Sequence, residues 1–225
     1  MEEALDPDDL VVGADASVLI DLVEGKRLPG LKELFGAVGV PALVKVEVKH
    51  NIRAHPLNRG ILAAPWLSSV AATDPEDLRL IADLHSAWGS SPPKNAGEAE
   101  LIALSLRHGW IALIEDRTAR NTAHVEGVHA VRLTTCAVAG AASGIVNADR
   151  AWGLHHGFHA RRPAHMRLPI GTTPADRTCF DRAIAKIEFL ISKLGTPAWP
   201  GILHHPSLTP GKIDEVVART AKGGS

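Results

Sequence analysis

Residues 10–25, LVVGADASVLIDLVEG, decide the fold. The apolar run 10–14 predicts a short buried strand, and the pattern over 17–25 predicts a helix that ends at Gly25. A strand that passes into a helix within a few residues is the building unit of α/β proteins. Asp15 lies at the junction between the two elements.

The same alternation continues to about residue 146 and predicts an α/β fold with a central parallel sheet flanked by helices. Further strands are expected at 37–40, 66–72, 110–115 and 128–133. Helices are expected at 29–36, 42–52, 73–88, 97–109, 117–127 and 134–144. The helix from Thr73 is predicted from a capping box that ends at Glu76.

The sequence changes character near residue 147, so we expect a first part at 10–146 and an extension at 147–225. The stretch up to about 174 is rich in His, Arg, Gly and Pro and has no clear period. Residues 175–195 predict an amphipathic helix, and a short helix is expected near the C-terminus. One long helix gives little core, which favours a mainly helical appended extension over an independent domain.

Composition narrows the class of protein. The 225 residues are 45% hydrophobic and 22% charged, as in ordinary globular chains, and no apolar run approaches the length of a membrane span. Two cysteines exclude a disulfide framework and, with an acidic N-terminus that lacks signal-peptide features, favour a cytoplasmic location. Residues 1–150 hold 14 Lys and Arg against 20 Asp and Glu, and residues 151–225 hold 10 against 5, so an acidic part precedes a basic one.

Two acids follow predicted strands. Asp15 ends the first strand, and Asp116 follows the strand at 110–115, with Glu115 beside it. Ligands of parallel sheets gather at the carboxyl ends of the strands, which makes these acids site residues. Each also stands at a helix start, where an acid commonly caps the helix, and that interpretation stays open.

The helix at 97–109 presents two acids on different faces. At about 100° per residue, Glu98 falls on the apolar side with Ile102, and Glu100 falls on the opposite, solvent side. A carboxylate aligned with the core needs a partner such as a metal. The alternative is that Glu98 favours the helix dipole in the first turn and reaches water.

The predicted helix at 42–52 carries one more candidate acid, Glu47. Around the axis of this helix, Glu47 falls between Leu43 and Val44. Lys45 and Lys49 are each two residues from Glu47, a spacing at which side chains on a helix do not face each other. This favours an inward or cleft-facing role over an exposed ion pair.

Four carboxylates from separate segments form a plausible metal site. The residues are Asp15, Glu47, Glu98 and Asp116. Oxygen ligands suit Mg²⁺ or Mn²⁺ rather than zinc, and several acids do not stay ionised together without a cation between them. Such a site is suited to phosphodiester hydrolysis, because the metal activates water and neutralises phosphate charge.

The ordered set of motifs resembles the PIN-domain nucleases found as VapC-type toxins. The matching segments are ADASVLIDL (14–22), GAVGVPALVKVEV (36–48), GEAELIALSLRHG (97–109), ALIEDRTARNTA (112–123) and VHAVRLTTCAVAGAASGIV (128–146). The resemblance covers about residues 10–146 and leaves an additional C-terminal extension of about 75 residues, which such toxins commonly lack.

The resemblance implies a three-layer α/β/α sandwich with a central parallel sheet. It also implies an Mg²⁺- or Mn²⁺-dependent ribonuclease whose metal ligands are the four acids. It also implies that Ser17 orients Asp15 and that Glu115 is an alternative to Asp116. Of the two acids in the third motif, the helical angles favour Glu98 over Glu100 as the metal ligand. The partners expected are an RNA substrate, an antitoxin protein and a second copy of the chain.

Basic residues near the site and in the extension suggest contacts with nucleic acid. Arg117 and Arg120 flank the proposed site and are candidates for phosphate binding, with ordinary helix-start polarity as the alternative.

In the extension, arginines at 150, 161, 162 and 167 accompany Trp152 and Phe158, a mixture suited to single-stranded RNA. The alternative is that the aromatic rings pack inside the protein, and it is slightly favoured. His155 and His159 have the spacing of helical metal ligands, but Gly157 disfavours a helix there.

Two other functions fit the same sequence. One is a non-catalytic binding or scaffold module in which the acids only cap helices, and the other is a nuclease directed at DNA. The chain has no G-x-G-x-x-G after a strand, no phosphate-binding P-loop motif and no G-x-S-x-G elbow.

Overall fold

The computed structural model describes residues 6–89, 95–159, 176–194, 199, 201–204 and 210–221. The chain forms two compact units. Unit 1 consists of Met1–Glu24 and Phe35–Ala130, and unit 2 consists of Gly25–Leu34 and Val131–Ser225. The predicted boundary between 146 and 147 marks a change of sequence character, and it stays a prediction.

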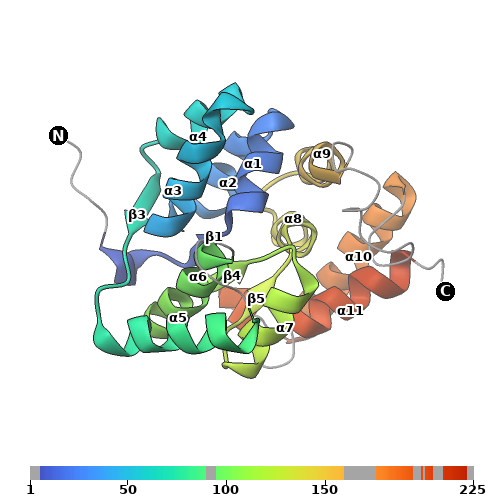
Figure 1. Cartoon of the computed structure of the whole chain (residues 1–225). Helices are drawn as coiled ribbons and strands as arrows, with labels where there is room; N and C mark the ends of the chain where they lie inside the picture. The colour runs from blue at the N-terminus through green and yellow to red at the C-terminus, as the bar shows by residue number, and fades with distance from the viewer. Residues whose placement is uncertain are drawn as a thin grey trace. The chain divides into compact units, whose positions relative to one another are not determined.

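A five-stranded parallel sheet in the order β3-β2-β1-β4-β5 is flanked by helices, which confirms the predicted fold class (Figure 1). The strands are β1 (Val12–Ala14), β2 (Val38–Pro41), β3 (Leu67–Val70), β4 (Ile111–Leu113) and β5 (Ala130–Val131). The pair Ala14 and Leu113 brings the carboxyl ends of β1 and β4 side by side. All three residues of β1 and of β4 are buried, as expected for short apolar runs in a parallel sheet.

The helices of unit 1 follow the predicted order. They are α1 (Ala16–Glu24), α3 (Ala42–His50), α4 (Arg59–Leu62), α5 (Pro75–Ala87), α6 (Ala96–His108) and α7 (Arg117–Val125). The short α4 was not predicted. The start of α5 was predicted one residue too early, because Asp74, not Thr73, is the cap and accepts a hydrogen bond from the Glu76 amide.

Paired glycines in β1 and β2 create the space for the largest side chain of the core. Gly13 and Gly39 are register partners, and a Cβ on either one would lie 2.8 Å or less from the Trp110 ring. The indole is buried, and its Nε1 donates to the Pro7 carbonyl at 2.9 Å. The absence of two side chains thus lets one aromatic ring lie flat on the sheet.

Unit 2 is helical and has its own core around one buried helix. Its helices are α2 (Leu28–Phe35), α8 (Leu133–Ala142), α9 (Ala148–His159), α10 (Arg177–Leu194) and α11 (Pro210–Ala221). Residues 133–141 of α8 are all buried, and α9, α10 and α11 pack on it. The predicted amphipathic helix is confirmed as α10, with Phe180, Ile184 and Ile187 buried. The helix at the centre of this core, α8, lies before residue 147, and the expectation of an appended extension at 147–225 stays a prediction.

The stretch without a clear period contains α9, so the expectation that Gly157 disfavours a helix there was wrong. Its glycines serve packing, since the Arg27 side chain occupies the space that a Cβ on Gly157 would need. His155 is buried in unit 2, and its Nδ1 is 2.9 Å from the Thr134 hydroxyl oxygen.

The aromatic residues of α9 belong to the interior of unit 2. Phe158 is fully buried, and the Trp152 ring meets Phe180 edge to face. Arg150 pairs with Glu33. These contacts favour the packing alternative over an exposed RNA platform. The arginines at 161, 162 and 167 lie outside the described residues, as does the side chain of His159. Within the described part of the chain, no helix has the length and apolar character needed to cross a membrane.

Candidate functional site

Asp15 lies directly after β1, at the edge of the sheet where β4 also ends. Its amide donates to the Leu113 carbonyl at 3.2 Å, which anchors the residue to the neighbouring strand. The side chain is 2% exposed, and its Oδ2 accepts hydrogen bonds from the Ser17 hydroxyl at 2.6 Å and the Ser17 amide at 3.2 Å. Ser17 therefore fixes the orientation of this carboxylate.

Asp116 follows β4 and begins α7. Its Oδ1 accepts from the Ala119 amide at 2.8 Å, so Asp116 is a true helix cap. The capping interpretation of this acid is correct, and the cap also places the carboxylate at the edge of the sheet that carries Asp15.

Glu98 and Glu47 come from two helices that approach each other closely. Glu98 is in the first turn of α6, and Glu47 is near the end of α3. A Cβ on Gly97 would lie 2.8 Å from the Val44 Cγ2 and 3.6 Å from the Glu47 Oε2. Glycine at this position lets α3 and α6 meet, and it brings the Glu47 carboxylate to the start of α6.

The electrostatic interactions of Glu98 involve the three other predicted acids. Partial burial and the charges of Asp15, Glu47 and Asp116 raise the pKa of Glu98 to about 7 from its usual value of 4.5, against a lowering hydrogen bond within Glu98 itself. Burial and the charge of Asp15 likewise raise the pKa of Glu47. We call this group, Asp15, Glu47, Glu98 and Asp116, the acidic cleft. Among the described residues, neither Glu47, Glu98 nor Asp116 forms an ion pair with a lysine or arginine.

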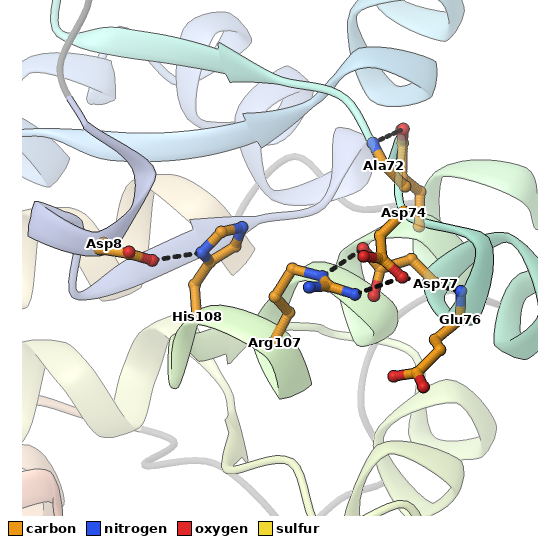
Figure 2. A network of polar contacts seen from close by, with 8 residues as sticks. Asp8, Ala72, Asp74, Glu76, Asp77, Arg107 and His108 are labelled. Atoms are coloured by element: carbon orange, nitrogen blue, oxygen red, sulfur yellow. Dashed lines mark hydrogen bonds and ion pairs between the residues drawn. The ribbon is translucent and has the colours of Figure 1, made fainter.

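Glu100 does not lie on the solvent face, and that expectation was wrong. Its side chain is 4% exposed, and its two carboxylate oxygens accept from the Leu43 amide at 2.7 Å and the Ala72 amide at 3.1 Å. The contact at Ala72 is drawn in Figure 2. Because α5 and α3 pack on α6, most of that helix is buried, and a single-face angular argument fails. Glu100 joins the segments after β2 and β3.

The remaining predicted residues lie between the end of β4 and the first turn of α7. Glu115 is 3% exposed, unlike the exposed Asp116. Arg117 is exposed. The Arg120 Nη1 donates to the carbonyls of Ile114 at 3.1 Å and Glu115 at 3.0 Å. Arg120 thus holds the turn that carries Asp116, a role the sequence did not indicate.

Two cavities open on the acidic cleft and share Glu98 and Asn95. One, of about 510 Å³, lies between α3 and α6 and includes Glu47 and Asn51. The other, of about 480 Å³, lies between the end of α5 and the starts of α6 and α7 and includes Trp88 and Asp116. Asn95 and Trp88 were not predicted as site residues, because neither lies at a strand end nor belongs to an acidic pattern.

The donor set fits a hard divalent cation in its chemistry. The acidic cleft offers only carboxylate oxygens, and their mutual repulsion is the condition that a cation relieves. In the part of the chain that is described, no three Asp, Glu, His or Cys side chains are arranged to hold a metal ion. The carboxylates of Asp15, Glu47 and Asp116 thus act electrostatically on Glu98, but the four side chains are not arranged as ligands of one ion.

Comparison with known families agrees with the resemblance seen in the motifs. A family model described as a PIN domain matches residues 11–148, close to the 10–146 expected. Neither the curated proteins nor the solved structures gave a match.

Proposed function

The chain belongs to the PIN-domain family, and from this premise we propose that it is an endoribonuclease that uses a divalent metal held in the acidic cleft. PIN domains are commonly nucleases that use divalent metals. The metal proposed is Mg²⁺ or Mn²⁺, since the donors are all carboxylates.

The observation that carries the proposal is the mutual influence of the four carboxylates. The three charges that raise the pKa of Glu98 belong to acids from three other segments of the chain. Acids that only cap helices have no reason to gather in this way, because each adds to the cost of ionising the others. A cleft that collects negative charge is suited to a cation and, through it, to a phosphate.

The residues of the cleft have separate tasks in this proposal. A bound divalent cation would supply an activated water and neutralise charge on the scissile phosphate. Ser17 holds the Asp15 carboxylate in one orientation, and the Ala119 amide does the same for Asp116. The raised pKa of Glu98 means that this carboxyl binds a proton near neutral pH when no cation is present.

Arg117 is the candidate for holding the phosphate of the substrate, since it is exposed at the start of α7. Arg120 positions the turn, because its guanidinium is bonded to backbone carbonyls.

The test replaces an acid of the cleft without disturbing the helix that carries it. Asp116→Asn retains an oxygen that can accept from the Ala119 amide, so the cap survives while the charge is lost. We expect Asp116→Asn and Asp15→Asn to lower RNA cleavage at least about 100-fold with an unchanged circular dichroism spectrum. Cleavage at the wild-type rate by both variants would refute the site.

Asp74→Asn is the matched control. Asp74 also caps a helix through its side chain, at the start of α5, but it pairs with Arg107. We expect this variant to retain cleavage.

The preference for RNA and the role as a toxin are the finer parts of the proposal, and both rest on the resemblance to VapC-type nucleases. Cleavage of single-stranded RNA and DNA oligonucleotides of one sequence tests the preference, and equal rates would contradict it. Growth arrest on expression, which Asp116→Asn abolishes, tests a toxin role. An antitoxin, a homodimer and a cytoplasmic location stay predictions.

A further inference from the structure

The cavity of about 480 Å³ beside the acidic cleft has an aromatic wall. Its lining includes the acids Glu98 and Asp116 as well as Trp88 and Ala87. The volume is within the range of small-molecule sites and is sufficient for one nucleoside. An apolar wall next to a charged cleft indicates a ligand with one flat, weakly polar part and one anionic part.

The Trp88 ring is held in place by α7. Its Nε1 donates to the Thr122 hydroxyl oxygen at 3.1 Å, and that hydroxyl in turn donates to the Thr118 carbonyl at 3.1 Å. The ring packs against the core cluster that includes Leu84, Ala119 and Ala123, yet it is only partly buried. Because the indole N–H already has a partner, the ring offers the cavity π surface rather than a hydrogen-bond donor.

Asn95 supplies a polar group at the mouth of the same cavity. It has a φ of 59°, in the left-handed region, and its side chain does not cap α6. Within the described residues, its carboxamide has no hydrogen-bond partner, although Asn95 lines both cavities. A carboxamide donates and accepts at once, so it can bond to the edge of any base.

We propose that this cavity is the binding site for one unpaired nucleobase, which stacks on Trp88 while Asn95 contacts its edge. The inference rests on the proposed nuclease function and deepens it. The base would belong to a nucleotide next to the scissile phosphate, since the cavity shares Glu98 and Asp116 with the acidic cleft. A base in a duplex is stacked and paired, so the site selects single-stranded RNA.

The first experiment measures base binding without cleavage. The full chain, labelled with ¹⁵N and kept in EDTA, is titrated with adenosine, which carries no phosphate for the acids to repel. The indole signal that is missing from the Trp88→Phe spectrum belongs to Trp88. We expect this signal to shift saturably at millimolar adenosine, while the signal of Trp152, in unit 2, stays fixed. No shift of the Trp88 signal would overturn the inference.

The second experiment separates stacking from a structural role. We expect Trp88→Leu to raise the KM for single-stranded RNA about tenfold or more with kcat little changed. Trp88→Phe keeps an aromatic ring but loses the bond to Thr122, so it should raise the KM less than Trp88→Leu. A duplex of the same sequence should be cleaved at least about tenfold more slowly. A fall in kcat alone, or equal cleavage of the duplex, would overturn the inference.

The two proposals fail in different ways. RNA cleavage without a shift of the Trp88 signal removes only the base site. A saturable shift without cleavage in either metal removes the nuclease and leaves a base-binding cavity.

Discussion

Unit 1 carries two groups of acids, and they differ in the charged groups that act on them. In the first group, Arg107 lies between Asp74 and Asp77 at 2.8 Å and 2.6 Å (Figure 2). These acids raise the pKa of the Arg107 guanidinium, so its charged form is favoured. In the acidic cleft the charges that act on Glu98 are all negative, and its pKa rises to about 7.

The difference separates structural acids from acids suited to a ligand. Asp77 is 6% exposed and remains compatible with the fold because its cation is part of the same protein. Among the described residues, Glu47, Glu98 and Asp116 of the acidic cleft form no ion pair with a lysine or arginine, so their charge is available to a cation from outside. An acidic cluster becomes informative about function when the protein does not neutralise it.

The largest effect is expected from moving a fixed cation into the acidic cleft. Glu98→Lys places an ammonium among the other three acids and makes the cleft resemble the Arg107 group. Cleavage should fall at least about 100-fold, because the lysine competes with the metal, while the thermal unfolding temperature is retained or raised. Cleavage assays and thermal denaturation in EDTA check both parts, and a variant that still cleaves at the wild-type rate would break the comparison.

A smaller effect is expected from neutralising Glu98 in the metal-free protein. Its folded pKa of about 7 lies above the usual 4.5, so the folded state binds more protons than the unfolded state between these values. The ionised Glu98 carboxyl therefore lowers the unfolding free energy most above pH 7. This destabilisation disappears as the pH falls through 7 toward 4.5. Glu98→Gln should raise the unfolding free energy at pH 8 by about 1–3 kcal/mol and have little effect at pH 4.5.

Urea denaturation in EDTA at the two pH values measures this difference. Equal stability of Glu98→Gln and wild type at pH 8 would mean that the acids do not act on one another. Glu76→Gln is a suitable control, since Glu76 is an exposed first-turn acid of α5.

The smallest effect concerns the group that has its own cation. Arg107→Ala leaves the Asp77 carboxylate without this partner and should lower the unfolding temperature by about 2–6 °C. Arg107→Lys should recover part of the loss, because the charge returns without the two-pronged geometry. RNA cleavage by both variants should remain within about threefold of wild type, and a larger loss of kcat would tie this group to the site.

Sequence patterns predicted the acids that the backbone alone positions. Asp15 and Asp116 follow buried strands that pair in parallel, so their meeting at one sheet edge follows from topology. The charge of Asp15 acts on Glu98, and the choice of Glu98 over Glu100 as the metal ligand stays a prediction, but part of the reasoning behind it was wrong. Glu100 is buried because α6 has neighbours on two sides, which a helical wheel does not represent.

Features that depend on packing between distant segments could not be predicted from the sequence. Helix α9 forms despite Gly153 and Gly157 because the Arg27 side chain lies against both positions. Trp88 and Asn95 border the site only because α5, α6 and α7 converge there. Nothing in the local sequence distinguishes these two residues from an ordinary helix end and an ordinary loop.

The central claim is that the acidic cleft takes a divalent cation that the Arg107 group does not need. Isothermal titration of the full chain with Mn²⁺ at pH 7.5 tests this claim most directly. The account predicts saturable binding in wild type, at least about tenfold weaker binding in Asp116→Asn, and wild-type binding in Arg107→Ala. No binding at millimolar Mn²⁺, or equal binding by wild type and Asp116→Asn, would contradict it.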